Sequence, residues 1–96
     1  DHRRVPNLEA YLKRMDASLP VTKNPEDYQA GDLVTWRLGG RLPHIGIVSK
    51  NKTRTGTPLI IHNIGAGPVE NDILFGAPIN GHFRYFPDGN TPAQTP

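Results

Sequence analysis

Apolar and polar residues alternate along the middle of the chain with the period of two that is typical of half-buried β-strands. The clearest case is residues 33–38, where Val34, Trp36 and Leu38 alternate with Leu33, Thr35 and Arg37. Residues 43–48 and 59–63 are short apolar runs rich in β-branched residues, and residues 71–75 and 81–86 add two weaker candidates. The pattern predicts an antiparallel sheet of about four to five strands.

A helical period appears near the N-terminus. Leu8, Tyr11, Leu12 and Met15 fall at positions i, i+3, i+4 and i+7 behind a candidate N-cap, Asn7. We expect an amphipathic helix from about Leu8 to Asp16 that packs on the sheet, with the charged residues off the apolar stripe: Glu9, Lys13 and Arg14. The predicted fold class is therefore α+β.

Proline and small polar residues mark the segments without regular structure. Residues 18–30 contain Pro20 and Pro25 and are predicted to form a surface loop. Residues 87–96 are rich in Pro, Gly, Thr and Gln, and we expect a disordered tail there.

Two of the predicted strands each carry one histidine and flank a polar segment, residues 50–57, which indicates a β-hairpin. A turn centred on Thr53 places His44 opposite His62 on one face, with Cβ atoms roughly 5 Å apart. A register shifted by one residue brings Asn63 onto that face in place of His62. In either register, Gly46 leaves room beside His44 for another group to approach.

Several readings of the two histidines remain open. A histidine held by a second polar side chain suits a general base and the group that orients it. A pair of hydrogen-bonded structural histidines fits the same pattern. In a third reading, His44 and His62 are zinc ligands, although no spacing matches a known motif, and the set would be completed from His2, His82, Asp32 or Asp72.

Composition and charge argue against several classes of function. The chain of 96 residues forms one domain at most, and its net charge of +2 is too small and too evenly spread to indicate nucleic acid binding. No run approaches the ~18 apolar residues of a membrane span. There is no cysteine, so the chain supplies no disulfide, thiolate ligand or thiol nucleophile, and we expect no metal and no cofactor. A single short helix covers a sheet poorly, and we expect further protein N-terminal to Asp1.

Three motifs together resemble the second half of the NlpC/p60-like, papain-like cysteine peptidases. They are residues 28–36 (YQAGDLVTW), 43–48 (PHIGIV) and 60–63 (IIHN). A more specific resemblance, to the bacterial family called domain of unknown function 1287, rests on residues 1–8 (DHRRVPNL), 42–48 (LPHIGIV) and 62–68 (HNIGAGP). This second resemblance runs from Asp1 to about Phe86.

The resemblance implies specific roles. His44 is the catalytic base and His62 its orienter, or Asn63 if the hairpin register is shifted. We expect substrate contacts from Trp36, Gly46, Asn63 and Gly65. For Trp36 itself, a core anchor is the favoured interpretation and a substrate platform the alternative. Residues 1–86 are then a partial papain-like domain, whose cysteine nucleophile lies in an N-terminal segment of the same protein.

The implied activity belongs to the intact protein. It is an amidase or endopeptidase that cleaves peptidoglycan stem peptides in the periplasm or outside a bacterial cell, and residues 1–96 alone are inactive. Two alternatives are a non-catalytic domain that binds wall peptides or a partner protein, and a small β-barrel interaction module with structural histidines.

Overall fold

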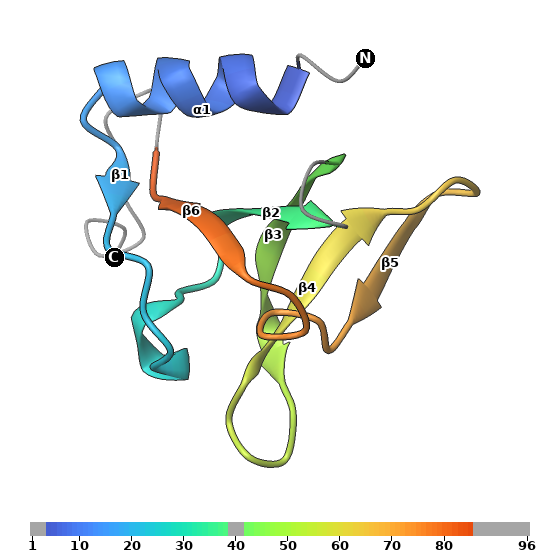
Figure 1. The fold of residues 1–96 in the computed structure, drawn as a ribbon. Helices are drawn as coiled ribbons and strands as arrows, with labels where there is room; N and C mark the ends of the chain where they lie inside the picture. The colour runs from blue at the N-terminus through green and yellow to red at the C-terminus, as the bar shows by residue number, and fades with distance from the viewer. Residues whose placement is uncertain (1–3, 39–41, 86–96) are drawn as a thin grey trace, which may run out of the picture.

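The computed structural model describes residues 4–38 and 42–85, which form one α-helix and one six-stranded sheet (Figure 1). Every strand pair in the sheet is antiparallel. The α+β class predicted from the sequence is confirmed, with six strands in place of the expected four to five. The elements are α1 (Arg4–Arg14), β1 (Ser18–Leu19), a 3-10 helix η1 (Pro25–Asp27), β2 (Leu33–Leu38), β3 (Leu42–Lys52), β4 (Pro58–Asn63), β5 (Pro68–Asn71) and β6 (Ile79–Phe83).

The strand order in the sheet is β1-β6-β2-β3-β4-β5. Strands β2 to β5 form a meander in which each strand pairs with the next one along the chain. Strand β6 then returns to the other side of β2, and the short β1 pairs with its outer edge. The histidine-bearing strands β3 and β4 therefore lie inside the sheet, with a neighbour on each side.

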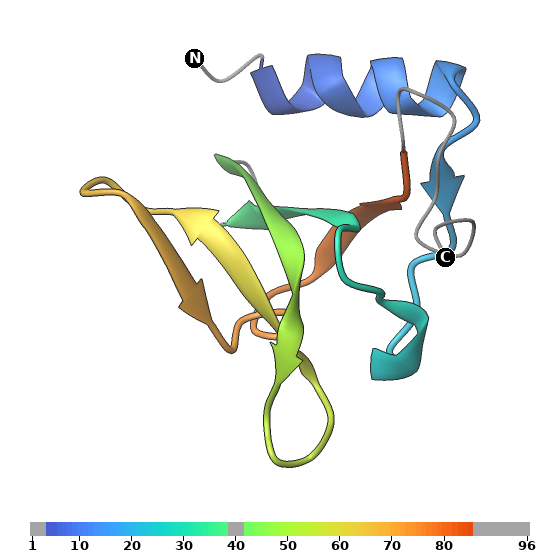
Figure 2. The same ribbon diagram turned by 180° about the vertical axis from the view of Figure 1, so that it is seen from behind.

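The sheet has an apolar cluster on each face. On one face, Val34, Trp36, Val48 and Ile60 pack together with Tyr28 and Leu74 from the loops. On the other, Phe83 packs against Leu12 of α1 and Ala17. Both ribbon views place α1 at the end of the sheet opposite the long β3–β4 loop (Figures 1 and 2).

A buried carboxylate attaches α1 to the sheet. Glu9 accepts hydrogen bonds from Thr35 Oγ1 at 2.5 Å and Asn80 Nδ2 at 2.8 Å, and it forms an ion pair with Arg37 at 2.5 Å. Burial alone would raise the pKa of Glu9, but these hydrogen bonds and the Arg37 charge outweigh it and lower the pKa below its usual value. The expectation that Glu9 lies away from the packed face is wrong, because three polar partners compensate its burial.

The helix begins earlier than the sequence pattern predicted, at Arg4, so Asn7 lies inside it rather than at its cap. Pro6 is tolerated because the first turn of a helix has no backbone acceptor for its missing N–H. Two members of the expected apolar stripe, Tyr11 and Met15, are exposed. The buried side of α1 is made by Leu12 and Glu9.

Two other expected segments differ. Residues 18–30 are not all loop, because Ser18 and Leu19 pair with Phe83 and His82. Residues 72–75 do not form a strand with Asn71; the strand ends at Asn71, and the chain turns back through a loop that buries Leu74. The predicted tail 87–96 and the final residue of the last predicted strand, Phe86, lie outside the described residues.

No helix in residues 4–38 and 42–85 is long and apolar enough to span a membrane.

Candidate functional site

The pairing of β3 with β4 brings the two histidines to one face of the sheet. Ile47 pairs with Ile61 and Val48 with Ile60, so the register differs by two residues from the expected one, which had His44 directly opposite His62. An irregularity between Val48 and Lys52 accommodates the difference. A shift of two residues keeps every side chain on its face. His44 and His62 therefore remain neighbours, now on a diagonal across the two strands.

The histidine rings are hydrogen-bonded in a row that ends at an asparagine. His44 Nε2 lies 2.9 Å from His62 Nδ1, and the two rings are perpendicular with centroids 5.0 Å apart. His62 Nε2 lies 2.8 Å from Asn71 Oδ1. Strands β3, β4 and β5 thus contribute one member each.

The asparagine determines where the protons of the neutral row lie. A carbonyl oxygen only accepts hydrogen bonds, so Asn71 Oδ1 requires the proton of His62 on Nε2. Nδ1 of His62 is then an acceptor, and His44 donates to it from Nε2. This leaves Nδ1 of His44 without a proton, as a general base requires.

The surroundings of His44 favour this neutral form. Burial is the larger effect and lowers the pKa of His44 below its ordinary value, and the neighbouring His62 lowers it further. His44 is only partly buried, so it remains partly accessible. A neutral, accessible imidazole with a fixed tautomer can take a proton from a nucleophile.

Asn71 did not stand out in the sequence. Its position follows from the β4–β5 hairpin, in which His62 pairs with Val69, and a residue two positions further along β5 lies on the same face. The signal that could have found it is the turn at residues 65–67, where Gly65 and Gly67 both have positive φ angles. Recognising a hairpin there, instead of an irregular loop, places Asn71 beside His62.

A pocket of about 270 Å³ opens beside the two histidines. Its remaining lining is apolar and comes from β2, from the end of β4 and from the loop after β5: Trp36, Ile64, Ile73, Gly76 and Ala77. Trp36 is a core residue with 1% exposure, and its ring centroid lies 5.8 Å from that of His44. It therefore acts as a core anchor and also forms part of the pocket wall.

The structure does not place the other predicted contact residues in this pocket. The space beside Gly46 is filled, because a Cβ there would lie 2.4 Å from Cγ2 of Ile60 and 3.3 Å from the Trp36 ring. Asn63 alternates with the buried His62 and is exposed on the other face of β4. Gly65 lies in the β4–β5 turn with a φ of 94°. Among the described residues, then, Trp36, His44 and His62 gather at the pocket, while Gly46, Asn63 and Gly65 lie outside its lining.

The geometry gives little support to the interpretation of His44 and His62 as zinc ligands. Both ring nitrogens of His62 are engaged with His44 and Asn71, which leaves no free lone pair for a metal. Residues 4–38 and 42–85 contain no group of three or more His, Asp, Glu or Cys side chains placed to hold a metal ion. Two of the expected further ligands, His82 and Asp32, pair with each other instead, and His2 lies outside the described residues.

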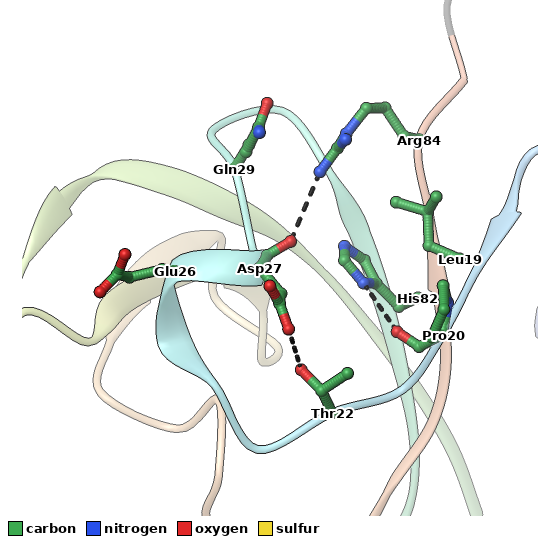
Figure 3. Close-up of a pocket in the computed structure, with 8 residues that line it drawn as sticks. All are labelled: Leu19, Pro20, Thr22, Glu26, Asp27, Gln29, His82 and Arg84. Atoms are coloured by element: carbon green, nitrogen blue, oxygen red, sulfur yellow. Dashed lines mark hydrogen bonds between the residues drawn. The ribbon is translucent and has the colours of Figure 1, made fainter.

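His82 and Asp32 belong to a second polar cluster. Figure 3 shows two side chains of this cluster, His82 and Arg84, beside η1. Asp32, fully buried, accepts from His82 Nε2 at 2.6 Å and from Nε and Nη2 of Arg84, each at 2.8 Å. The other ring nitrogen of His82 lies 3.4 Å from the carbonyl oxygen of Pro20, and its ring stacks on Tyr28 at 4.2 Å. Since both ring nitrogens already have partners, we assign this cluster a structural role.

Comparisons with known proteins confirm the resemblance to the family called domain of unknown function 1287. The family model described as domain of unknown function (DUF1287) matches residues 1–85. The uncharacterized protein YijF of Escherichia coli strain K12 is 60% identical over 86 residues, which are 90% of this chain and 42% of that relative. The chain thus spans less than half the length of the relative. No solved structure gives a significant match.

Proposed function

The chain belongs to the family of domain of unknown function 1287, and from this premise we propose that it is the base-bearing half of a papain-like cysteine hydrolase. One observation carries the proposal. The row formed by His44, His62 and Asn71 leaves Nδ1 of His44 free beside a pocket. In hydrolases that use an activated nucleophile, a third group orients the base in this way, and the free nitrogen of the base accepts the proton of the nucleophile.

The chemistry is acyl transfer through a thiol. The proton of a cysteine thiol passes to Nδ1 of His44, and the thiolate attacks the carbonyl carbon of an amide. The tetrahedral intermediate collapses to a thioester as the His44 imidazolium gives that proton to the leaving nitrogen. Water, deprotonated by Nδ1 of His44, then attacks the thioester, and the proton returns to the sulfur.

His62 and Asn71 keep the base oriented through both steps. The hydrogen bond from Nε2 of His44 to His62 persists in the neutral and the charged form of His44, because Nε2 carries a proton in both. Asn71 in turn fixes the ring of His62. No side chain has to reorient when the proton moves, which is the preorganisation that catalysis needs.

The nucleophile comes from another part of the protein. This chain has no cysteine, and it matches 42% of its relative, so the longer protein has room for a further segment. In the NlpC/p60-like peptidases that the motifs resemble, the cysteine begins a helix upstream of the histidine strand. We place it there, with the sulfur facing Nδ1 of His44.

The substrate class follows from the same resemblance. It is an amide bond in the stem peptides of peptidoglycan, and the location is the periplasm or the exterior of a bacterial cell. The apolar pocket beside His44 supports a peptide over a highly charged substrate.

The test uses the full-length protein that contains this chain. Purified peptidoglycan and soluble muropeptides are incubated with it, and the products are identified by mass spectrometry. Hydrolysis adds one water per bond and exposes a new amine, and iodoacetamide should abolish the reaction by alkylating the nucleophile. Binding of the muropeptides without turnover would contradict the hydrolase and support the wall-peptide binding domain.

A further inference from the structure

The pocket beside His44 has a wall that is held in place by burial and hydrogen bonds. Part of its wall is made by Ile73 and Ala77 in the loop that follows β5. This loop is fixed at its centre, because Leu74 is fully buried and its carbonyl oxygen accepts a hydrogen bond from Nε1 of Trp36 at 3.1 Å. The turn within it closes through the N–H of Gly76, which donates to Ile73 O at 3.0 Å.

The lining carries no ionised side chain. Its polar groups are the two imidazoles, which are already bonded to each other, and the rest of the surface comes from aliphatic residues and the Trp36 ring. A charged group that entered would lose its hydration without gaining a counter-charge. The transfer of an aliphatic group from water into the pocket would be favourable.

The volume limits what fits. About 270 Å³ is below the range of roughly 300–1,000 Å³ typical of pockets that hold a whole small-molecule ligand. It suits a single side chain. Because His44 lines the same pocket, that side chain belongs to a residue that flanks the bond being cleaved.

We propose that the pocket formed by Trp36, Ile64, Ile73 and Ala77 is a specificity subsite for an uncharged aliphatic side chain, of a size from alanine to leucine, next to the scissile amide. The proposal deepens the hydrolase function and rests on it. It makes Ile73 and Ala77 determinants of substrate choice.

The experiment measures kcat/KM of the full-length protein on a series of peptides that differ only at one residue beside the cleaved bond: Ala, Leu, Asp or Lys. An ionised side chain that enters an apolar pocket without a counter-charge loses its hydration without compensation, whereas Ala and Leu side chains carry no charge. We therefore expect the Ala and Leu peptides to exceed the Asp and Lys peptides by at least about 100-fold. Hydrolysis at equal rates across the series would overturn the subsite and leave the hydrolase standing.

Two variants that each replace an alanine by aspartate test whether the pocket selects the substrate side chain. Ala77→Asp should lower kcat/KM for the Ala and Leu peptides and reduce the handicap of the Lys peptide, since the new carboxylate supplies a counter-charge. The matched control is Ala66→Asp, an exposed position in the β4–β5 turn outside this pocket's lining, which should preserve the wild-type order. An unchanged order in Ala77→Asp would contradict the assignment.

A protein that hydrolyses no peptide of the series would count against the hydrolase, and calorimetric titration of the same peptides then decides the subsite. Tighter binding of the Ala and Leu peptides than of the Asp and Lys peptides would support an apolar binding pocket. Equal binding, or none, would overturn it.

Discussion

Asn71 is the outermost member of the hydrogen-bonded row, and its role can be tested apart from that of the histidines. Asn71→Ala removes the acceptor for Nε2 of His62, so the proton of His62 is no longer confined to that nitrogen and the ring of His44 loses its fixed partner. We expect kcat/KM of the full-length protein to fall about 10- to 100-fold, as is usual for groups that orient a functional histidine. A comparable thermal midpoint would show that the fold is retained.

The matched control for Asn71 is Asn63→Ala. Asn63 lies on the opposite face of β4, and the structure gives it no place in the row. Its removal should leave kcat/KM within about twofold of the wild type. If Asn63→Ala were the damaging variant and Asn71→Ala silent, the alternative register, with Asn63 beside His44, would be correct.

The environment of His44 predicts its titration. Burial first, and the nearby His62 second, lower the pKa of its imidazole, so the ring should stay neutral at pH values below the ordinary histidine pKa of about 6.5. Histidine ¹H–¹⁵N spectra recorded against pH should show a midpoint for His44 below 6.5. A midpoint at or above that value would contradict the conclusion that the surroundings of His44 favour its neutral form.

The same shift has a consequence for stability. The unfolded chain accepts a proton on His44 at a higher pH than the folded chain does, so the unfolded state gains relative stability as the pH falls below about 6.5. This loss continues down to the folded-state pKa of His44 and then levels off.

At this scale the sequence predicted the two histidines but not the third partner. The period of two along a strand places His44 and His62 on one face for any even shift in register, so the prediction survived an error of two residues. Asn71 depends on a second hairpin, whose sequence signal is limited to the two glycines of its turn, Gly65 and Gly67. Its catalytic role, like that of the histidines, stays a prediction.

Among the elements, β3 depends on the absence of a side chain at Gly46. A Cβ there would meet Ile60 Cγ2 at 2.4 Å and the backbone oxygen of Ile61 at 3.3 Å, and backbone cannot yield as a flexible side chain does. Gly46→Ala should lower the free energy of unfolding by about 2 kcal/mol, the usual cost of overpacking a core. Urea denaturation measures this directly.

Gly76→Ala is the control for Gly46→Ala. A Cβ at Gly76 would make ordinary contacts, the nearest at 3.4 Å, and its backbone does not require glycine. We expect a change within about 0.5 kcal/mol. Equal destabilisation by the two variants would show that the close packing of Ile60 and Trp36 over β3 is not what demands glycine.

The local sequence pattern predicts some elements correctly, but it misses features that depend on contacts with distant parts of the chain. Residues 33–38 alternate clearly and form β2 as predicted. The burial of Glu9 in α1 could not be predicted, since it depends on Thr35, Arg37 and Asn80 from other parts of the chain. Likewise, β1 is a strand only because β6 lies beside it.

Across the whole molecule, Asp32 joins segments that are far apart in the sequence. Its carboxylate binds Arg84 and His82 near the C-terminal end of the described chain, as well as the N–H of Gln29 after η1. Burial alone would raise the pKa of Asp32, but the hydrogen bonds from Arg84, His82 and Gln29 lower it below its usual value. The carboxylate therefore stabilises the fold in its charged form.

Replacing Asp32 should affect the whole fold. Asp32→Asn leaves Arg84 without its counter-charge, and we expect the free energy of unfolding at pH 7 to fall by about 3 kcal/mol. Because the folded-state pKa is depressed, this stabilisation is fully present above the ordinary pKa of about 3.8. It is lost as the pH falls through the lower folded-state value, so the wild type and the variant should converge in acid.

Asp72→Asn is the matched control, because Asp72 is exposed in the loop after β5. Its unfolding free energy should stay within about 0.5 kcal/mol of the wild type at pH 7. A difference between Asp32→Asn and the wild type that did not shrink in acid would contradict the role of the charged carboxylate.

The most direct measurement of the central claim is kcat/KM of the full-length protein with His44 replaced by alanine, on whichever muropeptide the wild type cleaves. A positioned general base contributes about 10²- to 10⁴-fold, and activation of the nucleophile depends on the same group. We predict a loss of at least about 10³-fold with an unchanged thermal midpoint. Turnover in His44→Ala within tenfold of the wild type would contradict the assignment of His44 as the base.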